Sequence, residues 1–280
     1  MTRLLTALVL AFLLTSCNLP LSASPTPALP LPAAETLPPP PPETVVPPTT
    51  LPATLSTLPP RPEEAILILE PGPGSRLVGS VHLAGIADPT FEQFLGIRIL
   101  LDDGSVLVQT STTIAVELGN RGPFTIDIPF TVVGERNAFI QVFTDSPRDG
   151  GITHLNSVGV TLAEAGPVDI APLGPHPEDI AITSPALWAT ISGGMAHVEG
   201  VGIASFEQTL VISIQNADGT TIATVPVILD APDWGLPGTF SVDVPYFVAG
   251  EQPGRIVVAD PSMVFEGETH LSSVEVTLAP

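Results

Sequence analysis

The sequence predicts an all-β protein with two consecutive β-sandwich domains, and three observations support this. An eleven-residue stretch occurs twice, as THLNSVGVTLA at residues 153–163 and as THLSSVEVTLA at residues 269–279. The second copy starts 116 residues after the first, which is the length of a small domain rather than of a solenoid repeat. Several segments alternate between apolar and polar residues, and aliphatic and β-branched residues are abundant, as is typical of strands.

The clearest alternation lies in residues 124–131, and residues 240–246 repeat it. A period of two places one face of a strand in the core and the other face in water. Pro129 and Pro245 lie within these segments. Because proline has no N–H to donate to a neighbouring strand, we expect both segments to be edge strands or to carry a bulge.

The segment 95–99 is matched by the segment 210–214, and each has three apolar residues of one parity. Asp103-Gly104 and Asp218-Gly219 follow them and predict hairpin turns, since glycine reaches positive φ without strain. Roughly seven short strands in roughly 100 residues is typical of an immunoglobulin-like sandwich. The chain has one cysteine, so the Cys…Trp…Cys pattern of antibody domains is absent from its sequence.

Residues 1–16 read as a targeting segment. Arg3 is followed by an apolar run from Leu4 to Leu14 that is too short to span a membrane. The run ends in Leu14-Thr15-Ser16-Cys17, which resembles the bacterial lipoprotein signal, so Cys17 is the predicted lipidation site. The alternative is an ordinary secretory signal with an incidental cysteine. Several acyl chains at Cys17 would anchor the protein stably, whereas one chain binds only marginally.

Residues 17–64 are rich in proline and predict a disordered tether, because proline removes backbone donors and favours an extended chain. A docking ligand or a glycosylated stalk are alternatives for this segment. The predicted sandwiches are residues 65–163 and residues 179–280. The linker of residues 164–178 contains several Pro and Gly residues, so we expect the sandwiches to be arranged as beads with limited mutual burial.

Short motifs recur in the same order in both copies. In the first copy they are Phe91-Glu92, Asp103-Gly104, Gly122-Pro123-Phe124, Ile128-Pro129-Phe130 and Asp145-Ser146-Pro147. In the second they are Phe206-Glu207, Asp218-Gly219, Phe240, Val244-Pro245-Tyr246 and Asp260-Pro261-Ser262. With a valine-rich last strand, this set resembles the immunoglobulin-like domain of bacterial spore-germination proteins, the Gmad type. The departures at Tyr246 and around Pro261 make the second copy the more divergent one.

The resemblance covers nearly all of residues 65–279. It implies an extracytoplasmic protein, often a lipoprotein, that binds or scaffolds rather than catalyses. The sequence shows no partner germination domain, so a role in sporulation is not implied.

The composition and motifs exclude several function classes. A net charge of −21 with eight basic residues disfavours nucleic-acid partners, because the chain would repel phosphates. The sequence has no GxSxG, HExxH or phosphate-binding glycine loop. We therefore expect no catalytic residues, no cofactor and no enzymatic activity.

Four of the five histidines pair between the copies, His82 with His197 and His154 with His270. Such recurrence is compatible with a site made twice, but the sequence has no second ligand at metal-binding spacing. His82 and His197 also lie on the outward parity of their strands. We therefore interpret the four as solvated surface residues inherited by duplication, and we expect no metal site.

Two groups of residues are candidate partner-binding sites. Phe139 and Phe143 have outward parity on one strand, and Leu100 has outward parity on its expected neighbour, so we expect an exposed apolar patch. A bulge that shifts the parity and buries them is the alternative. Trp234 lies in a loop, and Trp188 lies elsewhere in the same domain. A loop tryptophan can stack on a sugar ring, but it more often caps a core.

The sequence thus predicts a lipid-anchored protein on the extracytoplasmic face of a cell membrane, attached through Cys17. Its two modules would contact an unknown envelope protein or the cell wall. The alternative function is a carbohydrate-binding surface lipoprotein that uses Trp188 and Trp234.

Overall fold

Two β-sandwiches with the same strand order make up the described part of the chain. The computed structural model describes residues 58–280, so the predicted signal peptide, Cys17 and most of the tether lie outside the described residues. The strands of the first sandwich are β1 (Ile66–Glu70), β2 (Arg76–Val78), β3 (Ser80–Ala87), β4 (Phe94–Leu101), β5 (Val106–Thr113), β6 (Gly122–Pro129), β7 (Glu135–Asp145) and β8 (Ile152–Ala163). Those of the second are β9 (Ile180–Ser184), β10 (Thr190–Ile191), β11 (Met195–Gly202), β12 (Thr209–Gln215), β13 (Thr221–Ile228), β14 (Gly238–Pro245), β15 (Gln252–Pro261) and β16 (Glu268–Leu278).

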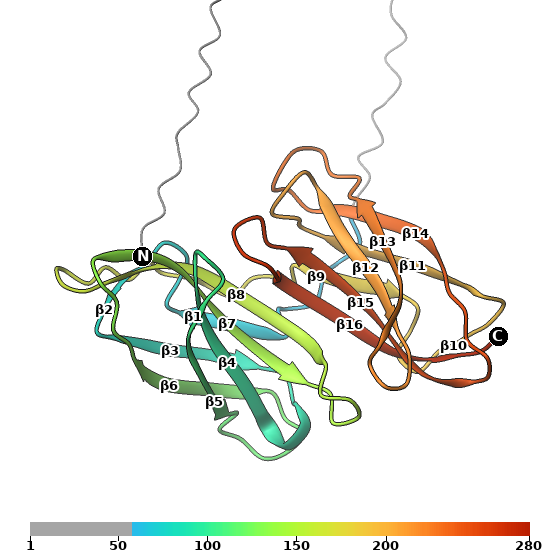
Figure 1. The fold of residues 1–280 in the computed structure, drawn as a ribbon, viewed down its shortest axis with the longest axis horizontal. Helices are drawn as coiled ribbons and strands as arrows, with labels where there is room; N and C mark the ends of the chain where they lie inside the picture. The colour runs from blue at the N-terminus through green and yellow to red at the C-terminus, as the bar shows by residue number, and fades with distance from the viewer. Residues whose placement is uncertain (1–57) are drawn as a thin grey trace, which may run out of the picture. The chain divides into compact units, whose positions relative to one another are not determined.

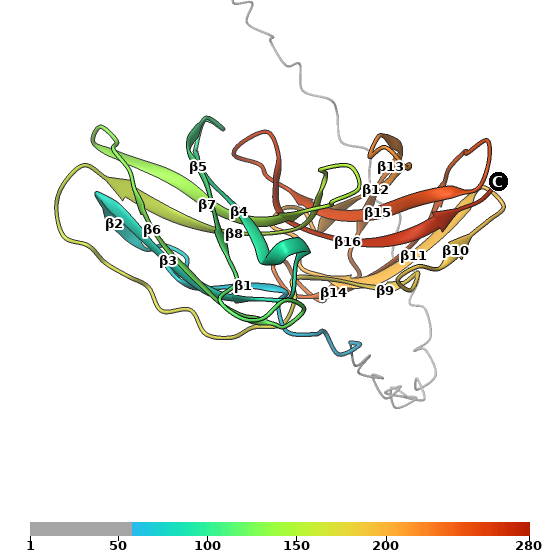
Figure 2. The same cartoon turned by 90° about the horizontal axis from the view of Figure 1, so that it is seen from below.

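Each sandwich packs a three-stranded sheet against a larger sheet (Figures 1 and 2). The small sheets have the orders β1-β3-β6 and β9-β11-β14, and the larger layers contain β5-β4-β7-β8 and β13-β12-β15-β16. The all-β fold class predicted from the alternation is therefore confirmed. Within residues 58–280, the one helical turn is the short segment Phe91–Gln93, and no helix is long and apolar enough to cross a membrane.

The turn and proline predictions are also confirmed. Gly104 and Gly219 have φ of +80° and +83° in the hairpins that join β4 to β5 and β12 to β13. The strands that end in Pro129 and Pro245, β6 and β14, each pair with one neighbour in their sheet, so they are edge strands.

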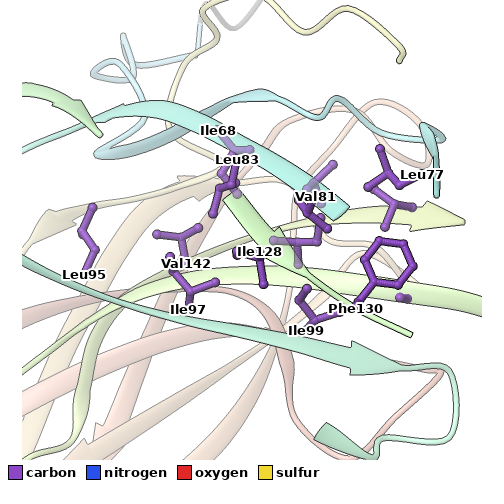
Figure 3. Packing of buried hydrophobic residues seen from close by; sticks show 14 of the residues in the cluster. Ile68, Leu77, Val81, Leu83, Leu95, Ile97, Ile99, Ile128, Phe130 and Val142 are labelled. Atoms are coloured by element: carbon purple, nitrogen blue, oxygen red, sulfur yellow. The ribbon is translucent and has the colours of Figure 1, made fainter. Parts of the chain in front are cut away.

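Each sandwich has its own core between its two layers. Figure 3 shows part of the first core, where side chains of β4 and β7 meet those of β3 and β6. The second core is built in the same way from β11, β12, β14 and β15. Gly85 leaves room for a ring in the first core, because a Cβ there would lie 2.4 Å from the Phe124 ring. Gly200 stands in the same relation to Phe240 at 2.3 Å.

The sandwiches are not separate beads, and that expectation is wrong. β8 and β16 pair antiparallel, with Leu155 opposite Leu271, so that the two larger layers form one ten-stranded sheet. The described residues, 58–280, lie in one compact unit. The linker of residues 164–178 runs along the first sandwich, where Arg76 and Asp169 exchange backbone hydrogen bonds.

A third apolar cluster joins the sandwiches across the β8–β16 pair. Phe143 and Leu155 from the first sandwich pack with Val257, Ala259 and Leu271 from the second. The Phe143 ring also covers Gly96 on β4, where a Cβ would lie 2.4 Å from it.

The prediction of an exposed apolar patch at Phe143 and Leu100 is therefore wrong. Both side chains have the outward parity that the sequence predicts, but each is only 7% exposed. The second sandwich covers Phe143, and the loop that carries Phe265 lies over the neighbouring part of the same face. Phe139 is half-buried, and its ring centroid lies 5.0 Å from that of Phe265.

Equivalent positions in the two sandwiches form the two ends of this interface. At one end Phe265, from the loop before β16, packs on Phe139 of β7. At the other end Asp149, from the loop before β8, binds Arg255 of β15 through both carboxylate oxygens at 3.0 Å. Positions 149 and 265, like 139 and 255, differ by 116. The same pair of positions is thus aromatic at one end and ionic at the other.

Arg255 is fully buried, so the ionic end depends on complete pairing. Its other nitrogens donate to Glu275 and Gln215, each at 2.9 Å. Arg148 donates to Asp149 at 2.8 Å and also reaches Glu275. Burial alone would raise the pKa of Asp149, but hydrogen bonds from the Gly151 backbone and the two arginines lower it from 3.8 to about 2.

Replacing Phe143 by alanine should destabilise the protein by about 3 kcal/mol, because it removes a buried ring from the cluster between the sandwiches. Urea unfolding of the full chain measures this loss. Phe247→Ala is the matched control, since Phe247 is 83% exposed. A loss of less than about 0.5 kcal/mol for Phe143→Ala, comparable to an ordinary surface substitution, would contradict the burial of this ring.

Asp149 should contribute to acid sensitivity between pH 4 and pH 2. Because its folded pKa is lowered from 3.8 to about 2, its stabilising charge is fully present above pH 4 and is lost as the pH falls through about 2. Unfolding titrations of wild type and Asp149→Asn should therefore differ most above pH 4 and converge near pH 2.

The control is Asp103, whose pKa is also lowered to about 2, first by the Ser105 hydroxyl, on an exposed hairpin. Solvent screening should make the effect of Asp103→Asn smaller. An Asp149→Asn difference that is the same at every pH would refute the role of this charge.

Candidate functional site

Two histidines and two glutamates meet in the interior between the sandwiches. His154 lies on β8 and His270 on β16, while Glu64 and Glu178 lie two residues before β1 and β9. Glu64, Glu178 and His270 are at most 4% exposed, and the His154 side chain is 13% exposed. One ligand atom from each residue lies within 4.8 Å of those of the other three. We call these four residues the His–Glu cluster.

Each histidine binds the glutamate of its own sandwich and also approaches the glutamate of the other sandwich. The distance from His154 Nε2 to Glu64 Oε1 and that from His270 Nε2 to Glu178 Oε1 are both 2.9 Å. The crossed distances are 3.4 Å from His154 Nε2 to Glu178 and 3.9 Å from His270 Nε2 to Glu64. The cluster therefore has an approximate two-fold arrangement about the β8–β16 pair.

Backbone groups hold the two carboxylates from the opposite sandwich. The Ala65 N–H donates to Glu178 Oε2 at 2.9 Å, and the Asp179 N–H donates to Glu64 Oε2 at 3.3 Å. The chain segments themselves also pair, since the Glu64 N–H donates to His176 O and the Glu178 N–H to Pro62 O. Residues 61–64, assigned above to the tether, thus belong to the folded part.

Serines on β8 and β16 extend the same symmetry. Ser157 Oγ donates to Thr269 O at 2.5 Å, and Ser273 Oγ donates to Thr153 O at 2.7 Å. Ser272 Oγ lies 3.3 Å from His154 Nδ1 and donates to Glu178 Oε1 at 3.1 Å. His270 Nδ1 is buried and has no hydrogen-bond partner among the described residues.

The electrostatics favour an ion pair within the cluster. Burial by itself lowers the pKa of His270, but the hydrogen bond to Glu178 and the surrounding carboxylates raise it overall. Burial by itself raises the pKa of Glu178, but the His270 hydrogen bond and the nearby histidine charges lower it overall. Burial raises the pKa of neighbouring Asp179. The charged forms of His270 and Glu178 therefore stabilise each other.

The prediction that His154 and His270 are solvated surface residues is wrong. The hydrogen-bond partners of these histidines come from segments about 90 residues away along the chain and from the other sandwich, so no local spacing could reveal them. One signal was present: a Pro-Glu pair or Pro-Glu-Glu run precedes the first strand of each copy, at Pro62 and Pro177. His82 and His197 are exposed as interpreted, and each binds an aspartate across the sheet at 2.7 Å.

The structure does not bring the other predicted site residues into the His–Glu cluster. Trp234 is 71% exposed in its loop, so it does not cap a core. Trp188 is 68% exposed and lines a cavity of about 460 Å³ together with Phe91, Arg148 and Glu275. Trp234 is not among the residues that line it. The backbone of Trp188 has a φ of 64°, a conformation that is strained for a bulky residue.

Comparisons with known proteins find one family match and several distant structural similarities. A search of curated proteins finds no match. Among solved structures, dimeric latent PorU from Porphyromonas gingivalis matches with 13% identity over 78% of this chain and a TM-score of 0.26. This chain spans 20% of the length of that one. Bovine butyrophilin matches with 11% identity over 77% of this chain and 99% of its own, with a TM-score of 0.22. Such low similarity carries no argument about function.

The sequence pattern of one family matches part of the chain. Residues 65–151 match Gmad2, the immunoglobulin-like domain of bacterial spore germination. These residues include β1 to β7 of the first sandwich. Residues 65–151 therefore form a Gmad2 immunoglobulin-like domain.

Proposed function

We propose that the protein is a lipid-anchored, extracytoplasmic binding or scaffold protein. Its two sandwiches, the second a diverged copy of the first, would be presented as one unit to an envelope protein or to the cell wall. The observation that carries the proposal is a Gmad2 domain in a chain that begins with a lipoprotein-like signal ending at Cys17.

A binding role fits the chemistry of the described residues better than catalysis does. An immunoglobulin-like all-β fold is typical of non-enzymatic modules, and function on such folds resides in surface sites. The His–Glu cluster is the group of titratable side chains that could best support chemistry, but it is buried and its members bind one another. This makes it better suited to holding the sandwiches together than to acting on a substrate.

Lipid attachment should depend on the thiol of Cys17. Cells that express the chain and are fed a labelled fatty acid should give a labelled protein in the membrane fraction, and Cys17→Ala should abolish both the label and the fractionation. Ser22→Ala, a substitution close by in the same segment, should leave both unchanged. Label that survives Cys17→Ala would disprove the anchor.

Trp188 supports a second candidate, carbohydrate binding. Its exposed ring lies at a cavity whose lining also includes Phe91 and the charged groups of Asp145, Arg148 and Glu275. An aromatic face next to hydrogen-bonding groups suits a sugar ring, which has an apolar face and a polar edge. The strained backbone of Trp188 is held by its N–H, which donates to Glu275 O at 2.7 Å.

A retention assay on purified cell-wall glycan distinguishes carbohydrate binding from binding to a protein partner. If the protein binds glycan through these rings, Trp188→Ala or Trp234→Ala should lower retention roughly tenfold, the equivalent of about 1.4 kcal/mol. Phe247→Ala, which removes an equally exposed ring elsewhere, should leave retention unchanged. Failure of the wild-type protein to bind glycan, or equal retention of all variants, would reject the carbohydrate site and favour a protein partner.

A further inference from the structure

We propose that the His–Glu cluster is a structural zinc site that clips the two sandwiches together. Glu64 and His154 would supply two ligands from the first sandwich, and Glu178 and His270 would supply two from the second. The site would be closed, with all four ligands from the protein, as is usual for structural rather than catalytic zinc.

The spacing of the donor atoms fits a tetrahedral ion. Zinc bonds to histidine nitrogen and carboxylate oxygen at about 2.0–2.2 Å, which places tetrahedral ligands roughly 3.3–3.6 Å apart. With Oε1 as the ligand atom of each glutamate, three distances from histidine Nε2 to Oε1 are 2.9, 2.9 and 3.4 Å, while His270 Nε2 lies 3.9 Å from the other oxygen of Glu64, Oε2. One ligand atom from each of the four residues lies within 4.8 Å of the other three. The two imidazole rings are nearly perpendicular with centroids 5.4 Å apart, close to the roughly 5 Å expected for two rings on one ion.

The carboxylates are already oriented for this role. Oε2 of Glu64 and of Glu178 each accepts a backbone N–H from the opposite sandwich, while Oε1 of each faces the histidine of its own sandwich. Each glutamate can therefore bind an ion through one oxygen without losing the backbone hydrogen bond at the other. Ser272 Oγ near His154 Nδ1 orients that ring, as residues around metal sites commonly do.

The charge of the cluster also favours a divalent cation. Two buried carboxylates bring a charge of −2 into the interior, which one Zn²⁺ balances while both histidines stay neutral.

A cavity adjoins the cluster. A cavity of about 410 Å³ is lined by His154, Glu178 and Ser272, together with residues of the segment before β1 and of β9. Imidazole and carboxylate donors in a tetrahedral set suit zinc better than calcium or magnesium, which require more oxygen ligands.

The test uses the purified full chain after treatment with a chelator. Isothermal titration should show one zinc per chain, and saturating zinc should raise the melting temperature by roughly 5 °C or more. X-ray absorption at the zinc edge should show four nitrogen or oxygen ligands near 2.0 Å with imidazole scattering. Absence of saturable binding at 100 μM zinc, or a six-coordinate oxygen shell, would overturn the proposal and leave an ion-paired cluster.

Variants assign the binding to this cluster. His270→Gln and Glu178→Gln, which keep size and polarity, should abolish the zinc-induced rise in melting temperature. His197→Gln should not, although His197 is the exposed histidine with two carboxylates nearby, Asp243 at 2.7 Å and Glu199 at 3.1 Å. Loss of binding in His197→Gln alone would refute the site. If the cluster variants fail to fold, the absorption spectrum of the wild type decides, since it needs no substitution.

Discussion

The antiparallel pairing of β8 with β16 is the contact on which the arrangement of residues 58–280 depends. The final strand of each sandwich would otherwise present an open edge of backbone donors and acceptors, which is a liability in β-proteins. β16 pairs with residues 154 and 155 of the β8 edge, and the short strand β2 pairs with residues 161–163. Along the β16 edge, β8 pairs with residues 271 and 272 and β10 with residues 277 and 278. The pairing itself involves only two residue pairs. The apolar cluster around Phe143 and the serine hydrogen bonds flank it and add further contacts between the two sandwiches.

The approximate two-fold symmetry explains how one interface can hold different chemistries. Each contact position occurs twice, as in an isologous dimer, but the residues at the two equivalent positions can differ because both sandwiches belong to one chain. Phe139 with Phe265, and Arg255 with Asp149, occupy equivalent places. The difference between Gly159 and Glu275 follows the same division, because Gly159 faces the Phe139 ring and Glu275 binds Arg255. In the His–Glu cluster, by contrast, both sandwiches contribute the same residue types, one histidine and one glutamate each.

The sequence predicted what depends on local pattern. The alternation of apolar and polar residues predicted the strands, the Asp-Gly pairs predicted the hairpins, and Pro129 and Pro245 predicted the edge strands. These features could be predicted because each depends on residues that are neighbours along the chain. It also gave the correct parity of Phe139, Phe143 and Leu100. It could not show what covers that face, because the covering residues, such as Val257 and Phe265, lie more than 100 residues away.

Distance along the chain also explains why the interpretation of His82 and His197 is correct and that of His154 and His270 is wrong. His82 and His197 face water and bind aspartates within their own sandwich. His154 and His270 also bind a glutamate of their own sandwich, but that glutamate lies about 90 residues away along the chain, and the rest of their environment exists only once the two sandwiches meet. Proline and glycine in the linker suggested separation, but the linker instead follows the first sandwich through Arg76 and Asp169.

Residual dipolar couplings measured on the full chain test most directly whether the two sandwiches form one unit. The structure predicts that couplings from residues 65–163 and from residues 179–280 fit a single alignment tensor. Two tensors of different magnitude would show that the sandwiches reorient independently, and would contradict the interface described above.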